Sequence, residues 1–149
     1  MVSTGRRRDK VRTGGEYGTW MLAGMLLVAA AACRPDATTA RGAAESFLDA
    51  HYVAIDLPAA MPFTRGVARA KVEREMALVA GVPADETTRK PRVWYRLLEE
   101  HPDGAAAVRF LYEGTVSPED AERFQRRWLV TVRRDAEGWH VTNFEELPG

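Results

Sequence analysis

Five polar side chains in this sequence are of types that could do chemistry if folding brought them together: His51, Tyr95, Tyr112, Arg126 and Asn143. A histidine beside a tyrosine hydroxyl could exchange protons with a substrate, and an arginine could hold a substrate carboxylate. The competing interpretation is structural, because a tyrosine at a sheet edge buries its ring and leaves its hydroxyl in water. Arg126 and Asn143 fall near the outer end of the expected sheet, where solvent would surround them.

Other chemistry-bearing patterns are weak. The three histidines are far apart and none has a metal-ligand spacing, so we expect no metal site and no cofactor. Neither a glycine-rich phosphate loop after a strand nor a Gly-x-Ser-x-Gly nucleophile motif occurs. The stretch "RFQRRW" at residues 123–128 mixes arginine with aromatic residues, as nucleic-acid-binding proteins do. Strand alternation places Arg126 and Arg127 on opposite faces, so strand solubility explains it better and we expect no nucleic-acid partner.

The single cysteine, Cys33, follows a run of small apolar residues. Five basic and two acidic residues lie in residues 1–32, and no charge occurs from Tyr17 to Cys33. The strongly apolar part, residues 20–32, is shorter than the roughly 20 residues of a membrane-spanning helix. It has the length of the apolar region of a secretory signal, about 7 to 15 residues. The alternatives are an ordinary signal peptide without lipid and an uncleaved anchor.

The stretch Ala30-Ala31-Ala32-Cys33 resembles the lipobox of bacterial lipoproteins, in which small residues precede the lipidated cysteine. The resemblance implies a signal peptide over residues 1–32, cleavage after Ala32, and a lipidated tether over residues 33–38. Acyl chains such as palmitate would anchor the exported protein to a bacterial membrane in the cell envelope. A thioether on Cys33 would also remove a free thiol, which is a liability outside the cytosol.

Three helices are predicted before the strands begin. The first has Thr38 or Thr39 as its cap and an apolar stripe at three- and four-residue steps: Ala40, Ala43, Ala44, Phe47, Leu48 and His51. Asp56-Leu57-Pro58 starts a short helical turn that Pro62 ends. The third helix is expected over residues 64–80, and Gly81 ends it. Its stripe is Ala68, Val72, Met76 and Val79, and its solvent face carries the pairs Arg69–Glu73 and Lys71–Glu75.

After a loop over residues 82–91 the apolar period changes from 3.6 to 2, which predicts two β-hairpins. Their turns are "HPDG" at residues 101–104 and "DAEG" at residues 135–138. If each turn uses all four residues, the expected pairs are Leu97–Val108, Tyr95–Phe110, Arg134–Trp139, Val132–Val141 and Val130–Asn143. One face of the sheet then collects Val93, Tyr95, Leu97, Val108, Phe110, Tyr112, Trp128, Val130, Val132, Trp139 and Val141.

This order of elements predicts an α+β domain over residues 39–149, with three N-terminal helices packed on a four-stranded antiparallel curved sheet. With "FLDAHYVAID" on the first helix and "WLVTVRRDAEGWHVTNF" on the closing hairpin, it resembles the nuclear transport factor 2-like, or cystatin-like, cone fold. The resemblance implies an interior in which isomerases and dehydratases of this fold work. None of their catalytic motifs can be placed on this sequence. The inner face of the sheet and the first helix together place the five polar residues named above around that interior.

The opposite face of the predicted sheet is apolar. It would carry Trp94, Leu98, Leu111, Leu129 and Phe144, and exposed patches of this kind mark interfaces. Proteins of this fold often dimerise through the sheet, so we expect a homodimer or a docked envelope protein on this face. The alternative is that the C-terminal tail or the tether covers it.

The net charge of the chain favours no particular class of ligand or partner. The 21 basic and 21 acidic residues balance, and residues 33–149 carry 16 and 19 of them. Our hypothesis is a membrane-anchored envelope lipoprotein with a non-catalytic domain that binds a partner protein or a small apolar ligand. The alternatives are an isomerase or dehydratase that uses His51 with Tyr95 or Tyr112, and a structural accessory of an envelope complex.

Overall fold

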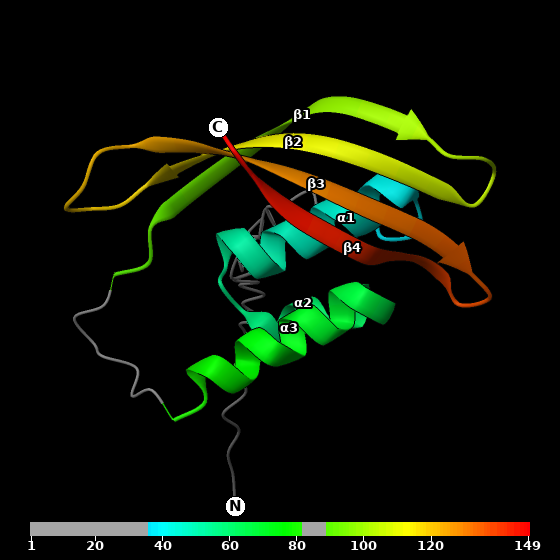
Figure 1. Cartoon of the computed structure of the whole chain (residues 1–149), viewed down its shortest axis with the longest axis horizontal. Helices are drawn as coiled ribbons and strands as arrows, with labels where there is room; N and C mark the ends of the chain where they lie inside the picture. Colours follow the sequence, from blue (N-terminus) through cyan, green and yellow to red (C-terminus); the bar gives the residue numbers. More distant parts are fainter. Residues whose placement is uncertain (1–35, 82–88) are drawn as a thin grey trace, which may run out of the picture. The chain divides into compact units, whose positions relative to one another are not determined.

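The computed structural model describes residues 36–81 and 89–149. Its helical elements are α1 (Ala40–Leu48), the π-helix η1 (Asp49–Val53), α2 (Leu57–Ala60), the 3₁₀-helix η2 (Met61–Phe63) and α3 (Gly66–Val79). The strands β1 (Arg92–Pro102), β2 (Ala107–Ser117), β3 (Phe124–Asp135) and β4 (Gly138–Pro148) form one antiparallel sheet in that order. All helices lie on one side of the sheet (Figure 1). The predicted α+β class and element order are confirmed.

The start of α1 is set by Thr39 and Gly42. Thr39 is extended, and its Oγ1 accepts a hydrogen bond from the Gly42 amide at 2.9 Å, which caps the helix. A Cβ on Gly42 would lie 1.7 Å from the Asp36 carbonyl oxygen, so only glycine allows this close approach. Behind the cap, the predicted stripe residues Ala43, Ala44, Phe47 and Leu48 are fully buried.

The widened turn η1 was not predicted from the sequence. The Ala54 amide bonds to the Asp49 carbonyl at 2.8 Å, five residues back, and the Asp56 amide reaches the Ala50 carbonyl at 2.8 Å. Ile55 ends this turn with a φ of 51°, a left-handed conformation that is unfavourable for a β-branched residue. The extra residue in the turn brings both His51 and Tyr52 against the ring of Phe47.

Helix α3 lies along the edge strand β4 and departs from two predictions. Ala68 and Val72 are buried as expected, but Val79 at the end of the stripe is 57% exposed. The Arg69–Glu73 pair forms, at 3.2 Å. The predicted Lys71–Glu75 pair is wrong, because both side chains reach across to other elements. Lys71 Nζ donates to Asn143 Oδ1 and to the Phe144 carbonyl, at 2.9 and 2.6 Å.

The second hairpin has the predicted pairing beside its turn, but the turn is residues 136–137 rather than all four residues of "DAEG", and the pairing then shifts by one residue. Arg134 pairs with Trp139 and Val132 with Val141, as expected. A bulge at Thr142 then places Asn143 opposite Thr131 and Phe144 opposite Val130. The predicted Val130–Asn143 pair is therefore wrong. Phe144, expected on the outer face, lies in the core and is 5% exposed.

The register of the first hairpin differs from the prediction by four places from Arg92 to Leu97, and by five places from Glu99 to Pro102. Leu97 pairs with Tyr112 and Tyr95 with Gly114, because the loop is residues 103–106 rather than "HPDG". An even shift preserves the alternation of faces, so the residues expected on the inner face do lie there. A second bulge, at Leu98, follows these pairs.

The core fills the space between the helices and the sheet. Its largest fully buried side chains are Trp128, Tyr112, Phe47, Phe110 and Leu48. Gly114 passes directly under Trp128, since a Cβ there would lie 2.1 Å from the indole Cη2. Among the helices that the structure describes, none has the length and hydropathy needed to cross a membrane.

Candidate functional site

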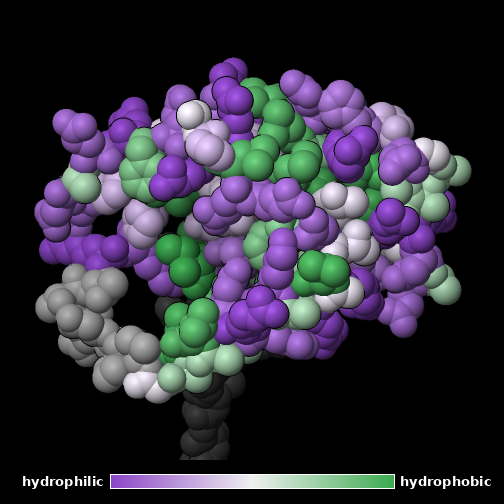
Figure 2. Space-filling model, viewed as in Figure 1, coloured by the Kyte–Doolittle hydropathy of each residue, from purple (hydrophilic) through white to green (hydrophobic). Residues whose placement is uncertain are grey.

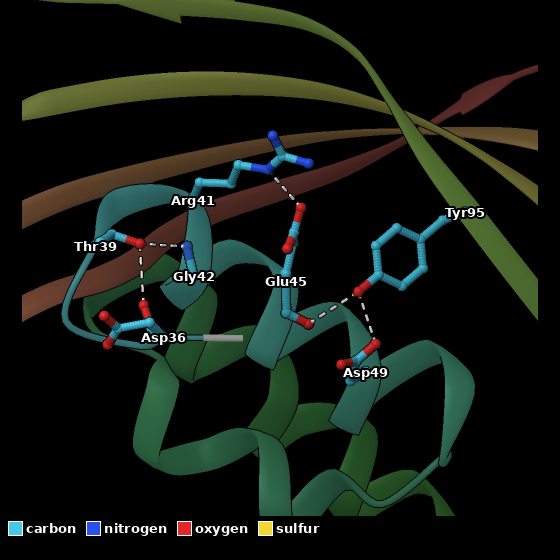
Figure 3. Close-up of polar contacts among 7 residues, drawn as sticks. All are labelled: Asp36, Thr39, Arg41, Gly42, Glu45, Asp49 and Tyr95. Atoms are coloured by element: carbon cyan, nitrogen blue, oxygen red, sulfur yellow. Dashed lines mark hydrogen bonds and ion pairs between the residues drawn. The ribbon is translucent and has the colours of Figure 1, made fainter. Parts of the chain in front are cut away.

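Tyr95 links the sheet to the first helical segment. Its hydroxyl donates to Asp49 Oδ1 at 2.7 Å and lies 3.4 Å from the Glu45 carbonyl oxygen (Figure 3). Glu45 in turn pairs with Arg41 at 2.7 Å. Burial, followed by the hydrogen bond to Asp49, raises the pKa of the Tyr95 phenol. Tyr95 therefore stays protonated at neutral pH and acts as a donor that holds β1 against η1.

Tyr112 lies beside Tyr95, with its ring edge-on at a centroid distance of 5.6 Å. Its side chain is fully buried, and its hydroxyl has no hydrogen-bond partner among the described residues. Burial raises the pKa of the Tyr112 phenol, and the negative charge of Glu45 adds to this. The ring is therefore part of the core and does not line an open pocket.

His51 pairs with a carboxylate inside a set of aromatic rings. Its Nε2 lies 2.6 Å from Glu75 Oε2, while its Nδ1 is buried without a partner in the described part of the chain. The rings of Phe47, Tyr52 and Phe144 lie 5.0, 4.4 and 5.1 Å from the imidazole. A histidine oriented by a carboxylate is a common acid–base arrangement. Here the rings occupy the space on which a substrate would have to lie.

Tyr52 extends this cluster to the sheet. Its ring stacks on Trp128 at a centroid distance of 4.3 Å and an angle of 21°. Within residues 36–81 and 89–149, neither the Tyr52 hydroxyl nor Trp128 Nε1 has a hydrogen-bond partner. Burial raises the pKa of the Tyr52 phenol, and the charge of Glu146 adds to the shift. We therefore regard Phe47, His51, Tyr52, Trp128 and Phe144 as one aromatic cluster that closes the interior.

The remaining two predicted pocket residues lie elsewhere. Arg126 is exposed, and its guanidinium lies 4.9 Å from the centre of the Phe124 ring. Asn143 accepts from Lys71, and its amide nitrogen donates to Glu145 Oε1 at 2.9 Å. The described structure thus brings Tyr95 next to Tyr112 but gathers no pocket from the five residues. Asn143 is displaced from the inner face because the bulge at Thr142 shifts the pairing of β4 by one residue.

The outer face of the sheet carries the apolar residues that were expected there, except Phe144. Trp94 is 51% exposed, and Leu98, Leu111 and Leu129 are partly exposed. Leu111 and Leu129 lie directly opposite each other on β2 and β3. Figure 2 shows apolar surface over the strands, bordered by hydrophilic side chains, and a second apolar area at the C-terminal end of α3. The sheet therefore offers a mixed surface with an aromatic side chain at one end.

Four residues that take part in this site were missed from the sequence: Asp49, Tyr52, Lys71 and Glu75. Glu75 had a detectable signal, because it lies seven residues after Ala68, on the buried stripe of α3. A carboxylate at such a position needs a partner, and His51 supplies it. The roles of Asp49 and Tyr52 depend on the π-turn, for which no pattern in the sequence was recognised.

No group of three or more metal-ligating side chains gathers anywhere in the part of the chain that the structure describes. The predicted lipid-attachment residue, Cys33, lies outside the described residues, as do the signal peptide and the first half of the tether, residues 33–35.

No protein-family model and no curated protein matches the chain. Its structure is similar to that of a protein from Thiobacillus denitrificans assigned as a calcium/calmodulin-dependent protein kinase type II association domain. The TM-score is 0.56 at 15% identity, covering 74% of this chain and 95% of that one. A ketosteroid isomerase-like protein from Erwinia carotovora atroseptica gives 0.51 at 16% identity, covering 72% and 91%. These likenesses show the nuclear transport factor 2-like cone fold, which was expected, and not an activity.

Proposed function

We propose that this chain is an exported, lipid-anchored envelope protein whose domain binds a partner through the outer face of its sheet, without catalysis. One contrast carries the proposal. Trp128, Tyr112 and Phe47 fill the interior in which related enzymes hold substrate, whereas Trp94 on the outer face is half exposed. Tryptophan is among the residue types that contribute most to binding energy at protein interfaces. The association domain among the structural neighbours has the same fold.

The docking role is tested by site-specific photo-crosslinking in intact cells. We expect a crosslinker placed at Trp94 to give a discrete protein product, and Leu129→Asp in the same chain to abolish it. A product of twice the chain mass would identify a second copy as the partner. The matched control is a crosslinker at Arg133, an exposed residue near the other end of β3. The docking role fails if positions 94 and 133 crosslink alike.

The anchor rests on Cys33 and the apolar run before it. We expect the wild-type chain to incorporate radiolabelled palmitate and to fractionate with membranes. Cys33→Ser should lose the label, because the thioether cannot form. Equal labelling of the two chains would exclude lipid attachment at this residue.

A second candidate function is proton transfer of the isomerase type, and the 2.6 Å contact between His51 and Glu75 favours it. The ketosteroid isomerase-like neighbour raises the same question. The test is solvent deuterium exchange into a ketosteroid, with Glu75→Gln as the variant. Exchange that this variant abolishes would establish catalysis. Its absence with the wild-type chain leaves His51 as a core residue.

A further inference from the structure

A basic groove lies where β1 begins and β2 connects to β3, at the left of Figure 1. It has a volume of about 480 Å³, and Arg89, Lys90, Arg92 and Arg123 line it together with Trp94 and one acidic residue, Glu119. Residues 33–149 carry more acidic than basic side chains. The groove is therefore a concentration of positive charge on an acidic body.

Two of the four cations are already engaged by other groups of the described chain. Arg89 pairs with Glu119, and Lys90 Nζ donates to the Ala54 carbonyl at 2.8 Å. Within the described residues, Arg92 and Arg123 pair with no carboxylate. The Arg123 guanidinium lies 5.9 Å from the centre of the Trp94 ring, within cation–π range.

This arrangement suits an extended anion better than a small one. Arg92 and Arg123 are exposed, and a single contact between exposed charges contributes little to affinity. Useful affinity therefore needs several carboxylates on one chain together with contact to the half-exposed Trp94. Arginine clusters recognise acidic protein motifs, and arginine and tryptophan dominate binding energy at interfaces. Ser117 is the sole uncharged polar side chain among the described residues lining the groove, so the hydroxyl groups of a sugar would find few partners.

The position of the groove argues against a membrane surface as the ligand. Ala37 and Thr38, next to the first described residue, lie beside the β3–β4 turn together with Gly138 and Trp139. The groove adjoins the opposite end of β3, which spans residues 124–135 and is about 36 Å long. The two ends are seen at the right and left of Figure 1. A tether entering at the turn would leave the groove at the far end of the domain.

We propose that this groove binds an acidic segment of a partner protein, with carboxylates against Arg92 and Arg123 and an apolar side chain on Trp94. This specifies the partner for the docking face proposed above and rests on that role.

The test uses the full chain in a non-ionic detergent and a fluorescein-labelled synthetic peptide in which glutamate alternates with leucine. A peptide with glutamine in place of glutamate is its matched control. Fluorescence polarisation should show at least tenfold tighter binding of the acidic peptide, with an advantage that shrinks as salt is added. The double variant Arg92→Gln/Arg123→Gln should remove this advantage. Arg133→Gln, at the far end of β3, should retain it.

Several results would overturn the proposal: equal binding of the two peptides, an equal loss in Arg133→Gln, or binding of heparin or phosphatidylglycerol vesicles through Arg92 and Arg123 without peptide binding. Near-ultraviolet spectra of each variant show that it is folded. The docking role is judged separately, by the crosslink at Trp94 and its sensitivity to Leu129→Asp. Loss of that crosslink in Leu129→Asp, combined with no peptide preference, would leave docking standing and reject the acidic partner.

Discussion

Replacing Gly114 by alanine should destabilise the domain strongly, although the change adds a single methyl group. The new Cβ would lie 2.1 Å from Cη2 and 2.3 Å from Cζ3 of Trp128. Carbon atoms pack at about 3.5 Å or more, so the indole would have to move by about 1.4 Å. The surrounding core leaves no space for this movement, because the Trp128 side chain is 2% exposed and its ring stacks on Tyr52 at a centroid distance of 4.3 Å. We expect a loss of about 3 kcal/mol in the free energy of unfolding.

A double-mutant cycle isolates this contact. Trp128→Phe removes the part of the ring that the new methyl group meets, at its own cost of about 2 kcal/mol for the lost burial. The double variant Gly114→Ala/Trp128→Phe should therefore be about 2 kcal/mol more stable than the sum of the single effects predicts. Urea unfolding of the full chain in a mild non-ionic detergent, followed by tryptophan fluorescence, gives each value. Ser117→Ala, on the same strand, is the control and should change stability by less than about 0.5 kcal/mol. Additive losses in the cycle would refute the packing argument.

The same unfolding assay checks three further predictions. Ile55→Gly should stabilise the domain by about 1 kcal/mol, because glycine accepts the φ of 51° without strain, and a loss of stability would contradict this. Phe144→Ala should lower the free energy of unfolding by about 3 kcal/mol, as expected for a buried ring, whereas Leu129→Ala should lower it by about 1 kcal/mol or less. Similar losses in the two variants would mean that Phe144 is not in the core. Burial raises the pKa of Tyr52, Tyr95 and Tyr112 above the unfolded value of 10.0, so the stability they contribute is complete below that pH and is lost as the pH rises above it. The urea midpoint of unfolding should fall less between about pH 8 and about pH 11 in Tyr95→Phe than in the wild-type chain. An equal fall in both chains would mean that Tyr95 does not contribute to this pH dependence.

The layers of the fold could be predicted from the sequence. The bulges, at which the pairing of two strands shifts by one residue, could not. Periodicity predicted the inner face of the sheet because alternation survives an even error in register, as in the four-place shift of the first hairpin. It failed at Phe144, since one extra residue at Thr142 exchanges the two faces without altering the local pattern.

The candidate site was predicted less well, for a related reason. His51 was expected to face the interior and does, but its partner Glu75 comes from a helix whose rotation about its axis only tertiary packing defines. The contacts of Asp49 and Tyr52 depend on the five-residue spacing of η1, whereas the apolar stripe of the sequence predicts the ordinary helical period. The closed interior is likewise a result of packing, because it needs rings from α1, η1, β3 and β4 at once.

The bulge at Thr142 has a consequence for how this protein could change. If pairing is kept from the β3–β4 turn onward and Thr142 enters the ladder opposite Thr131, Phe144 comes to lie opposite Leu129 and its ring turns toward solvent. The space beside His51 and Glu75 would then be vacated, next to the one oriented imidazole–carboxylate pair in the described interior. A filled module and a hollow one with a ready acid–base pair thus differ by a one-residue slip in the pairing of β4 beyond Val141, without any change of sequence.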